Sequence, residues 1–285
     1  MKLLLLPTLA LFTLAPLTHA AEPLKVLLIT GGCCHDYKAQ KDILKKGIEA
    51  RANVVVDQIH TDDKSTKPPL AILGNSDYAK GYDLVIHDEC AADINELSTI
   101  DAVLKPHLDG LPGVNLHCAM HCYRFGDYGK PVAAGADNGH WYTYIGIQST
   151  SHGPQEPIAI SYVNKESPIA KGFEDWTTIK EELYNNVQIL PATQAVARGK
   201  QIVKNKKKDA EGIETIEEKA VETVVAWTNE FGPKKARVFS TTIGHNNATV
   251  EDARYLDLVT RGVLWACDKL DADGKPKPGY GPAGK

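Results

Sequence analysis

The chain of 285 residues is 43% hydrophobic, 24% charged and only 7% aromatic, a composition that excludes disordered, collagen-like and coiled-coil proteins. Its 32 Lys and Arg residues and 36 Asp and Glu residues give a formal net charge of -4, so no large positive field is present to hold a nucleic acid. The length would allow two domains, but α/β folds often reach about 250 residues as one unit, and we predict one domain over residues 21–270.

Residues 1–20 have the pattern of a secretory signal peptide. Lys2 precedes an apolar stretch at residues 3–17, and the small-residue end Thr18-His19-Ala20 follows it. The apolar stretch is shorter than the roughly 18 to 20 residues that a membrane-spanning helix needs. We therefore expect cleavage after Ala20 and an exported chain, periplasmic or extracellular, with no membrane span.

The next segments alternate between strand and helix. Short apolar or β-branched runs predict four strands, at residues 25–30, 53–59, 83–87 and 113–117. The spacing of the apolar residues between them predicts two helices, at residues 37–50 and 94–108. This alternation is typical of an α/β fold with a mostly parallel sheet and helices on both faces.

The second half of the chain does not continue this alternation of strands and helices. Strands without long helices between them are predicted at residues 158–163, 187–190 and 221–227, and we interpret them as antiparallel additions to the sheet. The domain ends with a strand at 237–242 and an amphipathic helix at 250–268. The highly charged residues 198–219 predict a solvated hairpin tip, and the Gly-, Pro- and Lys-rich residues 271–285 predict a flexible tail.

Histidines stand at the ends of four predicted strands. They are His35, His87, His117 and His245. Ligands of open parallel sheets bind beyond the carboxyl ends of the strands, so we expect these strand ends to converge on one cleft. His117 and His121, four residues apart on a helix, can present two nitrogens to one metal, although His121 can instead pack against the sheet.

The six cysteines are too few for a disulfide scaffold in a chain that can bury its own core. The sequence leaves structural disulfides, free thiols and metal-bound thiols open, but Cys33 and Cys34 are adjacent and we do not expect them to bridge each other. Cys118 follows His117 in a strand-turn-helix segment similar to a nucleophile elbow, where a helix N-terminus would favour the thiolate. Cys118 is therefore either a candidate nucleophile or a small buried apolar residue.

Several short segments occur in an order that is typical of a known family. They include Leu28-Ile29-Thr30-Gly31-Gly32 with His35, Gly113-Val114-Asn115-Leu116-His117-Cys118-Ala119, Ser151-His152-Gly153, Glu181-Glu182-Leu183-Tyr184, and Ala236-Arg237-Val238-Phe239 through Gly244-His245-Asn246. Together they resemble the ThuA-like (trehalose utilisation) proteins over residues 26–270. The resemblance implies a flavodoxin-like, class I glutamine amidotransferase-like sheet.

The resemblance also places His117 at the elbow where glutamine amidotransferases have their cysteine, with Cys118 one residue later. Those enzymes need a His-x-Glu pair after the cysteine, and no histidine after Cys118 has Glu two residues on. We therefore do not expect ammonia release from glutamine. The chain departs from the family pattern in Cys33-Cys34 before His35 and in Ser167, where His is usual.

A candidate site follows from the matched residues. Glu182 matches the family's Asp-Glu-Leu-Tyr and can act as a base or as a metal ligand. A divalent metal such as zinc would accept this carboxylate together with imidazoles from His35, His117, His152 and His245. The same residues can instead bind sugar hydroxyls without a metal. Rings that can stack on a sugar face are those of Trp141, Tyr142, Tyr144 and Tyr184.

The resemblance implies an exported enzyme of carbohydrate metabolism that acts on a disaccharide or keto-sugar, with His117 and His245 as acid/base or metal-binding groups. A histidine with a metal can remove a proton beside a carbonyl and hold the enolate, so isomerase, lyase and hydrolase activities are all compatible. One alternative is a non-catalytic carbohydrate-binding or accessory protein on the same fold. Another is a cysteine hydrolase that uses Cys118. No prediction of oligomeric state follows.

Overall fold

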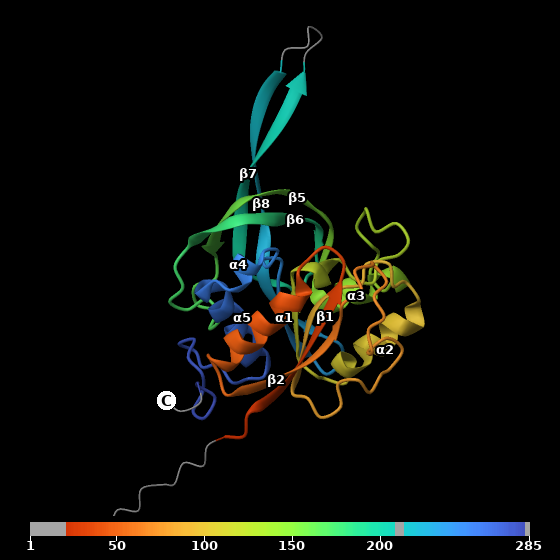
Figure 1. Cartoon of the computed structure of the whole chain (residues 1–285), viewed down its shortest axis with the longest axis vertical. Coiled ribbons are helices and arrows are strands. Elements are labelled where there is room, and N and C mark those ends of the chain that lie inside the picture. The colour runs from red at the N-terminus through yellow and green to blue at the C-terminus, as the bar shows by residue number, and fades with distance from the viewer. Residues whose placement is uncertain (1–20, 209–213, 283–285) are drawn as a thin grey trace, which may run out of the picture.

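The computed structural model describes residues 21–208 and 214–282, and one nine-stranded sheet runs through them (Figure 1). The strands lie in the order β2-β1-β3-β4-β9-β8-β7-β5-β6. Their bounds are β1 (Leu24–Gly32), β2 (Val54–Thr61), β3 (Leu84–Cys90), β4 (Gly113–Leu116), β5 (Ile147–Tyr162), β6 (Trp176–Ile189), β7 (Gln194–Lys208), β8 (Glu214–Phe231) and β9 (Ala236–Thr241). The predicted signal peptide, residues 1–20, lies outside the described residues.

The sheet has a parallel half and an antiparallel half. Strands β2, β1, β3, β4 and β9 pair in parallel, whereas β8, β7, β5 and β6 are each antiparallel to their neighbours. The prediction of an α/β fold with a parallel core and antiparallel additions from the C-terminal half is confirmed. Because β9 returns to the parallel half, the loop after it lies at the same sheet edge as the loops after β1, β3 and β4.

Helices cover both faces of the parallel half. They are α1 (Tyr37–Glu49), α2 (Leu97–Leu108), α3 (His140–Ile145), α4 (Asn247–Val250) and α5 (Ala253–Ala266), with short 3₁₀ helices η1 (His117–His121) and η2 (Asp137–Gly139). Val26 and Leu28 of β1 share a core with α1 and α5, whereas Leu27 and Ile29 share a core with α2 and α3. Successive side chains of a strand point to opposite faces, so β1 is apolar throughout because both of its faces are covered.

The closing helix that we predicted at residues 250–268 is confirmed as α5, and the short helix α4 precedes it. The helix α4 ends at Val250, and α5 begins at Ala253 after the N-cap Asp252, whose carboxylate accepts from the backbone N–H of Arg254 at 2.9 Å. No helix in the part of the chain that the structure describes is long and apolar enough to span a bilayer.

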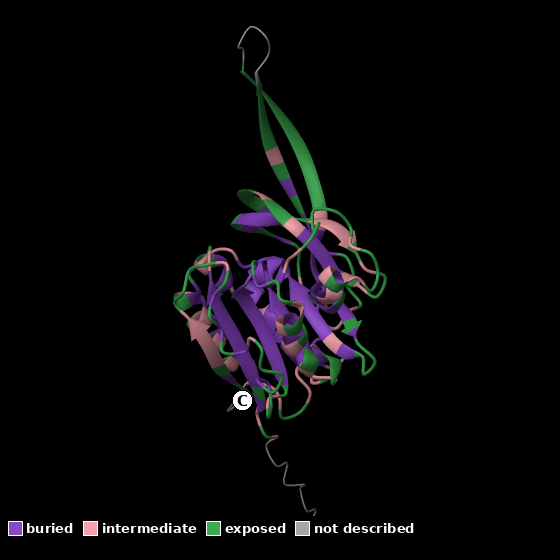
Figure 2. Ribbon diagram, turned by 90° about the vertical axis from the view of Figure 1, so that its right-hand side faces the viewer, coloured by how far each residue is buried: buried purple, intermediate pink, exposed green. Residues whose placement is uncertain are grey.

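The strands β7 and β8 extend beyond the body as a long hairpin whose outer part is exposed (Figures 1 and 2). Lysines of β7 face glutamates of β8, with Lys204 and Glu218 3.5 Å apart and Lys206 and Glu214 2.8 Å apart. Exposed pairs of this kind contribute at most about 1 kcal/mol each. The predicted solvated hairpin is confirmed, although its tip, residues 209–213, lies outside the described residues.

Residues 271–282, within the stretch for which we predicted a flexible tail, contact the body. The backbone N–H of Asn53 donates to the carbonyl of Tyr280 at 3.1 Å, and that of Lys277 donates to the carbonyl of Lys269 at 2.8 Å. The ring of Tyr280 packs against the core beneath α5, with the ammonium of Lys269 4.7 Å from its centroid. This partly buried aromatic side chain anchors a segment whose Gly and Pro content alone predicts mobility.

Candidate functional site

Three histidines from three distant segments meet at the carboxyl edge of the parallel half. His35 lies between β1 and α1, His117 begins η1 directly after β4, and His245 lies between β9 and α4. The ring centroids are 4.6 Å apart for His35 and His117, 4.8 Å for His35 and His245, and 5.6 Å for His117 and His245. One ring nitrogen from each lies within 4.8 Å of the other two. We call these residues the histidine cluster.

His117 occupies the sharp turn at the end of β4. Its φ of +40° lies in the left-handed region, which non-glycine residues adopt rarely and mostly at functional sites. The ring Nδ1 lies 2.6 Å from the carbonyl oxygen of Thr242. A carbonyl can only accept, so Nδ1 donates, and the other ring nitrogen, Nε2, lies 3.5 Å from an oxygen of Glu182. The turn therefore presents Nε2 to the carboxylate of Glu182.

The loop that carries His245 is held by a buried carboxylate. Glu181 of β6 is fully buried, and its carboxylate accepts the backbone N–H groups of Gly244, His245 and Asn246 at 3.4, 3.1 and 3.3 Å. The side chain of Gln40 on α1 donates to the carbonyls of Gly244 and His245 at 3.3 and 3.1 Å. The position of His245 is thus fixed by an anion and an amide from two other elements.

Glu182, the next residue on β6, lies at the centre of a group of histidines. Its carboxylate oxygens are 3.3 Å from Nδ1 of His245, 3.5 Å from Nε2 of His117 and 3.6 Å from Nδ1 of His152. The amide of Gln155 donates to it at 3.1 Å. Burial by itself would raise the pKa of Glu182, but hydrogen bonding to His117 and His245 and the nearby positive charge outweigh burial and lower the pKa well below its usual range. Glu182 is therefore a carboxylate at neutral pH.

The protonation of the cluster differs from ring to ring. Burial, followed by the neighbouring His117 and His245, lowers the pKa of His35 to about 3. The hydrogen bond with Glu182 raises the pKa of His245 above its ordinary value, although burial opposes the change. His35 is thus a neutral imidazole at physiological pH, the form that binds metals.

The cluster fits a divalent cation. Nδ1 of His35 is buried and has no hydrogen-bond partner among the described residues, and the only charged group of those residues paired with Nε2 of His117 and Nδ1 of His245 is the carboxylate of Glu182, at 3.5 and 3.3 Å. Buried polar atoms are nearly always paired, and three buried nitrogens around one carboxylate leave a position open for a further partner. Three imidazoles with a free fourth position form the ligand set of catalytic zinc sites, and a nearby carboxylate completes their chemistry.

A cavity of about 530 Å³ opens beside the cluster. His35, His245 and Glu182 line one part of it, and His152, Arg124 and Tyr184 line another. The volume lies within the range of small-molecule sites.

The other predicted site residues have separate positions. His152 is on the rim, with Nδ1 2.9 Å from the carbonyl of Gly153, and it is not part of the three-histidine group. Tyr184 is buried at the floor of the cavity, where its ring stacks on His121 at 4.2 Å. Trp141 is only 2% exposed and does not line the cavity, because its indole N–H donates to the carbonyl of Ala119 within the core, so it cannot stack on a sugar.

The structure gives the cysteines other bonding partners than the sequence predicted. Cys33 and Cys34 form a disulfide, although we did not expect adjacent cysteines to bridge. Cys34 has a φ of +84°, and this left-handed turn allows both side chains to lie on one side of the loop. Cys118 is buried with its Sγ 3.2 Å from Nε2 of His35, and its hydrogen bond with Cys90, followed by burial, raises its pKa well above the ordinary value.

Sequence reasoning did not single out Glu181, Gln40 or Thr242 as residues that position the site. Glu181 and Glu182 are consecutive on a strand, so they point to opposite faces, and the pair itself indicates that one of them is turned inward. The roles of Gln40 and Thr242 depend on contacts across more than a hundred residues, for which the sequence has no local signal.

The fold and the site define an α/β protein with a mixed sheet and a histidine cluster at the carboxyl edge of its parallel half. The chain belongs to the ThuA family, because the family model described as trehalose utilisation matches residues 25–266.

Solved structures also resemble the chain. A ThuA-like protein from Parabacteroides merdae shares 20% identity, with a TM-score of 0.57 over 90% of this chain and 97% of that one, which supports the fold. A protein described as part of a GMP synthase from Thermoplasma acidophilum shares 11% identity, with a TM-score of 0.47 over 87% and 96% of the two chains. A glutamine amidotransferase from Thermotoga maritima shares 11% identity, with a TM-score of 0.37 over 87% of this chain and 86% of that one. Comparison with curated proteins gives no match.

Proposed function

We propose that this chain is an enzyme of carbohydrate metabolism that acts on a disaccharide or keto-sugar and holds a divalent cation such as zinc at the histidine cluster. The observation that carries the proposal is the set of three buried nitrogens of His35, His117 and His245, which converge on one point with the carboxylate of Glu182 as the only charged group paired with them in the described part of the chain. The family description, trehalose utilisation, supports the sugar as substrate class. The cavity has room for a disaccharide.

In this proposal the cation would polarise a substrate carbonyl or lower the pKa of a bound water. Glu182 remains ionised at neutral pH, so it can accept a proton from a carbon next to that carbonyl or from water. Gln155 orients the carboxylate by donating to it at 3.1 Å. The backbone contacts of Glu181 keep His245 in place while the charge of the substrate changes.

The remaining lining residues are suited to a polar ligand. The guanidinium of Arg124 and the ring of His152 can hydrogen-bond hydroxyl or carbonyl oxygens of a sugar. Tyr184 lines the cavity, but its ring is held flat against His121 and is only 2% exposed, so it shapes the cavity wall and does not offer a face for stacking. Isomerisation, elimination and hydrolysis all use a base and an electrophile in this arrangement.

Metal analysis and a substrate panel test the proposal together. The purified protein is analysed for bound metal, then incubated with disaccharides and their 3-keto derivatives before and after chelation. We expect stoichiometric zinc or another divalent metal, turnover of one substrate class, and loss of both in His117→Ala. His140→Ala is the matched control, because this histidine is partly exposed and pairs with Asp101 away from the cavity.

Other outcomes would assign other functions. Sugar binding without metal and without turnover would overturn the enzymatic proposal in favour of a carbohydrate-binding protein. A cysteine hydrolase would be inactivated by alkylation and by Cys118→Ser. The raised pKa keeps Cys118 a thiol at neutral pH, which argues against a hydrolase of this kind, although the contact with His35 brings a base within 3.2 Å.

We also propose that the protein works outside the cytoplasm. The signal-peptide pattern of residues 1–20 is the basis, and the disulfide of Cys33 and Cys34 agrees with an oxidising compartment. Fractionation and intact-mass measurement of the expressed full chain test it. We expect a secreted or periplasmic product that begins at Ala21, whereas an unprocessed cytoplasmic product would contradict the proposal.

A further inference from the structure

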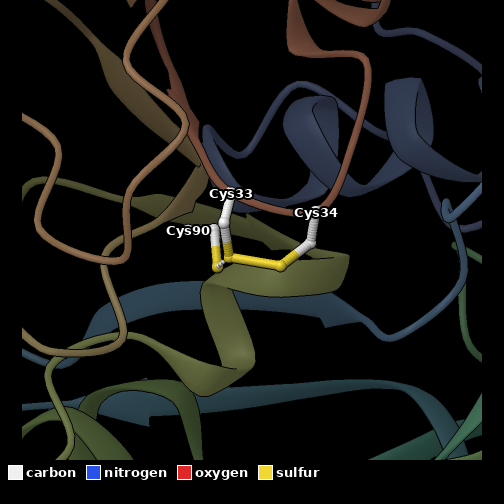
Figure 3. A group of neighbouring side chains, drawn as sticks. All are labelled: Cys33, Cys34 and Cys90. Carbon is white, nitrogen blue, oxygen red and sulfur yellow. Dashed lines mark hydrogen bonds between the residues drawn. A yellow bond between two sulfur atoms is a disulfide. The ribbon is translucent and has the colours of Figure 1, made fainter.

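A second group of ligand atoms, made only of sulfur, lies beside the histidine cluster. Cys33 and Cys34 come from the loop after β1, and Cys90 is the last residue of β3. One sulfur from each lies within 4.8 Å of the other two, and the sulfurs of Cys33 and Cys90 are 3.2 Å apart (Figure 3). We call these residues the sulfur cluster. Cys118 is not part of this three-sulfur group.

Strand pairing explains why the three side chains meet. In the parallel pair of β1 and β3, Gly32 is the partner of Cys90. A Cβ at Gly32 would lie 2.2 Å from the carbonyl oxygen of Cys90, so glycine is needed for the two strand ends to come this close. Cys33, the next residue, then lies against the Cys90 side chain. The sheet thus fixes two of the sulfurs, and the left-handed turn at Cys34 brings the third to them.

The positions of the three sulfurs differ in accessibility. Cys90 is only 3% exposed, Cys33 is half-buried, and Cys34 is exposed at the mouth of the cavity that all three residues line. A dissolved reductant or ion can therefore reach the disulfide from the cavity. The buried Cys90 contacts the Cys33 sulfur of this disulfide. No carboxylate or ring nitrogen belongs to this three-sulfur group, so its chemistry is that of a soft site.

We propose that Cys33, Cys34 and Cys90 form a redox-gated site for a thiophilic cation, separate from the histidine cluster. A dithiol reductant transfers two electrons and two protons to the Cys33–Cys34 disulfide and is itself oxidised to a disulfide. Three thiols then face one point, and each loses its proton to solvent as the cation binds. Thiolates favour soft ions such as Cu(I) and cadmium, whereas both thiolates and imidazoles bind zinc. The oxidised chain lacks two of the three ligands and is closed to the ion.

Cadmium is the probe that separates the two sites, because sulfur-to-cadmium charge transfer absorbs in the ultraviolet and imidazole ligands do not produce that band. The full mature chain is reduced with a dithiol, desalted without oxygen and titrated with Cd²⁺. We expect a charge-transfer band that saturates at one ion per chain, and no band in the oxidised chain. Equal bands in the two redox states would overturn the proposal.

Variants identify the ligands. Cys90→Ser in the reduced chain is expected to lose most of the band and to bind Cd²⁺ at least about tenfold more weakly. Cys267→Ser, the same change at the end of α5, is the matched control and retains the band. If circular dichroism shows that Cys90→Ser is unfolded, the exposed Cys34→Ser replaces it. Binding by both Cys90→Ser and Cys34→Ser at the strength of the unmodified chain would refute the site.

The proposed metal site at the histidine cluster can be disproved without disproving the site at the sulfur cluster. His117→Ala should retain the full charge-transfer band, whatever its effect on sugar turnover. A band that disappears in His117→Ala, with the fold intact, would mean that cadmium binds one mixed site and would overturn the claim of separate sites.

Discussion

Two groups of histidines lie near the same sheet edge, and their hydrogen bonding differs. In the histidine cluster, three buried ring nitrogens converge with Glu182 as the only charged group paired with them among the residues that the structure describes, and His35 and His245 line the cavity. In the second group, beneath the sheet edge, Nδ1 of His87 is 2.9 Å from Glu89, and its Nε2 is 3.2 Å from Nε2 of His107. The other nitrogen of His107 donates to the carbonyl of Leu111 at 2.9 Å.

This difference separates a binding site from a structural network. The second group is completely buried, and every ring nitrogen in it has a protein partner, so nothing is left for a ligand. The histidine cluster has the opposite pattern, because Nδ1 of His35 has no partner within the described ranges and the nitrogens of His117 and His245 share the one carboxylate of Glu182. Substitutions in the first group should therefore change activity, and substitutions in the second should change stability.

The largest effect is expected for Glu182→Gln. The amide has the shape of the carboxylate but cannot accept a proton, so turnover of the substrate found in the panel should fall by about 10²- to 10⁴-fold. Metal content and the urea midpoint should change little. The control is Glu156→Gln, the same change at an exposed position of β5. Steady-state kinetics on both variants give the measurement, and equal activity of the two would remove Glu182 from the mechanism.

For the structural group, His87→Ala should cost about 3–5 kcal/mol of unfolding free energy. The change leaves the hydroxyl of Tyr123, at 2.9 Å, as the only described partner of the buried Glu89 side chain and opens a cavity beside His107. Urea unfolding measures the loss, with His140→Ala as the exposed control. The metal content of the folded fraction should stay unchanged. If His87→Ala keeps its stability but loses its metal, the second group would be a binding site and not a structural network.

The same group should make the protein sensitive to acid. Burial, followed by the neighbouring His87, lowers the pKa of His107 from 6.5 to about 3. Between these values the unfolded chain binds a proton that the folded chain does not. The free energy of unfolding should therefore fall as pH drops from 6.5 toward 3, by about 1.4 kcal/mol per pH unit at most. His107→Gln should flatten the profile relative to His140→Gln, and parallel profiles would contradict this prediction.

Much of the fold was predictable because its signals are local. The apolar runs of β1, β3 and β4 and the spacing in α1 predicted the parallel half, and the change of rhythm after it predicted the antiparallel half. The boundaries were less predictable. We ended the third strand at His87, but β3 continues to Cys90, so His87 points into the α2 side of the core with Val85.

The histidines of the candidate site could be predicted from the sequence, but the residues that position their side chains could not. His35, His117 and His245 stand at strand ends, where the α/β rule places ligands. The residues that fix them act across the chain, as Glu181 does for His245, and no local pattern encodes such contacts. The disulfide of Cys33 and Cys34 depends on a left-handed turn at a non-glycine residue, a conformation that sequence patterns do not predict.

A smaller effect is expected where a residue acts through another. Glu181→Gln keeps the shape of the side chain but places an N–H₂ group and no charge against the backbone N–H groups of residues 244–246. Zinc affinity should fall by about 10- to 100-fold, and excess zinc should restore turnover. Isothermal titration of the metal-free protein gives the affinity, with Glu156→Gln as the control. Loss of activity that zinc cannot restore would instead make Glu181 part of the chemistry.

The smallest effect is expected for His152→Ala, which asks whether the fourth histidine that we predicted as a ligand belongs with the other three. Its side chain is 44% exposed, and its nearest charged partner, Glu182, is 3.6 Å away. A hydrogen bond to a sugar at such a solvated position contributes about 0.5–1.5 kcal/mol, so KM should rise less than about tenfold while kcat and zinc content stay the same. Loss of zinc in this variant would show instead that the rim histidine closes onto the ion, and the set of ligands would then be four imidazoles.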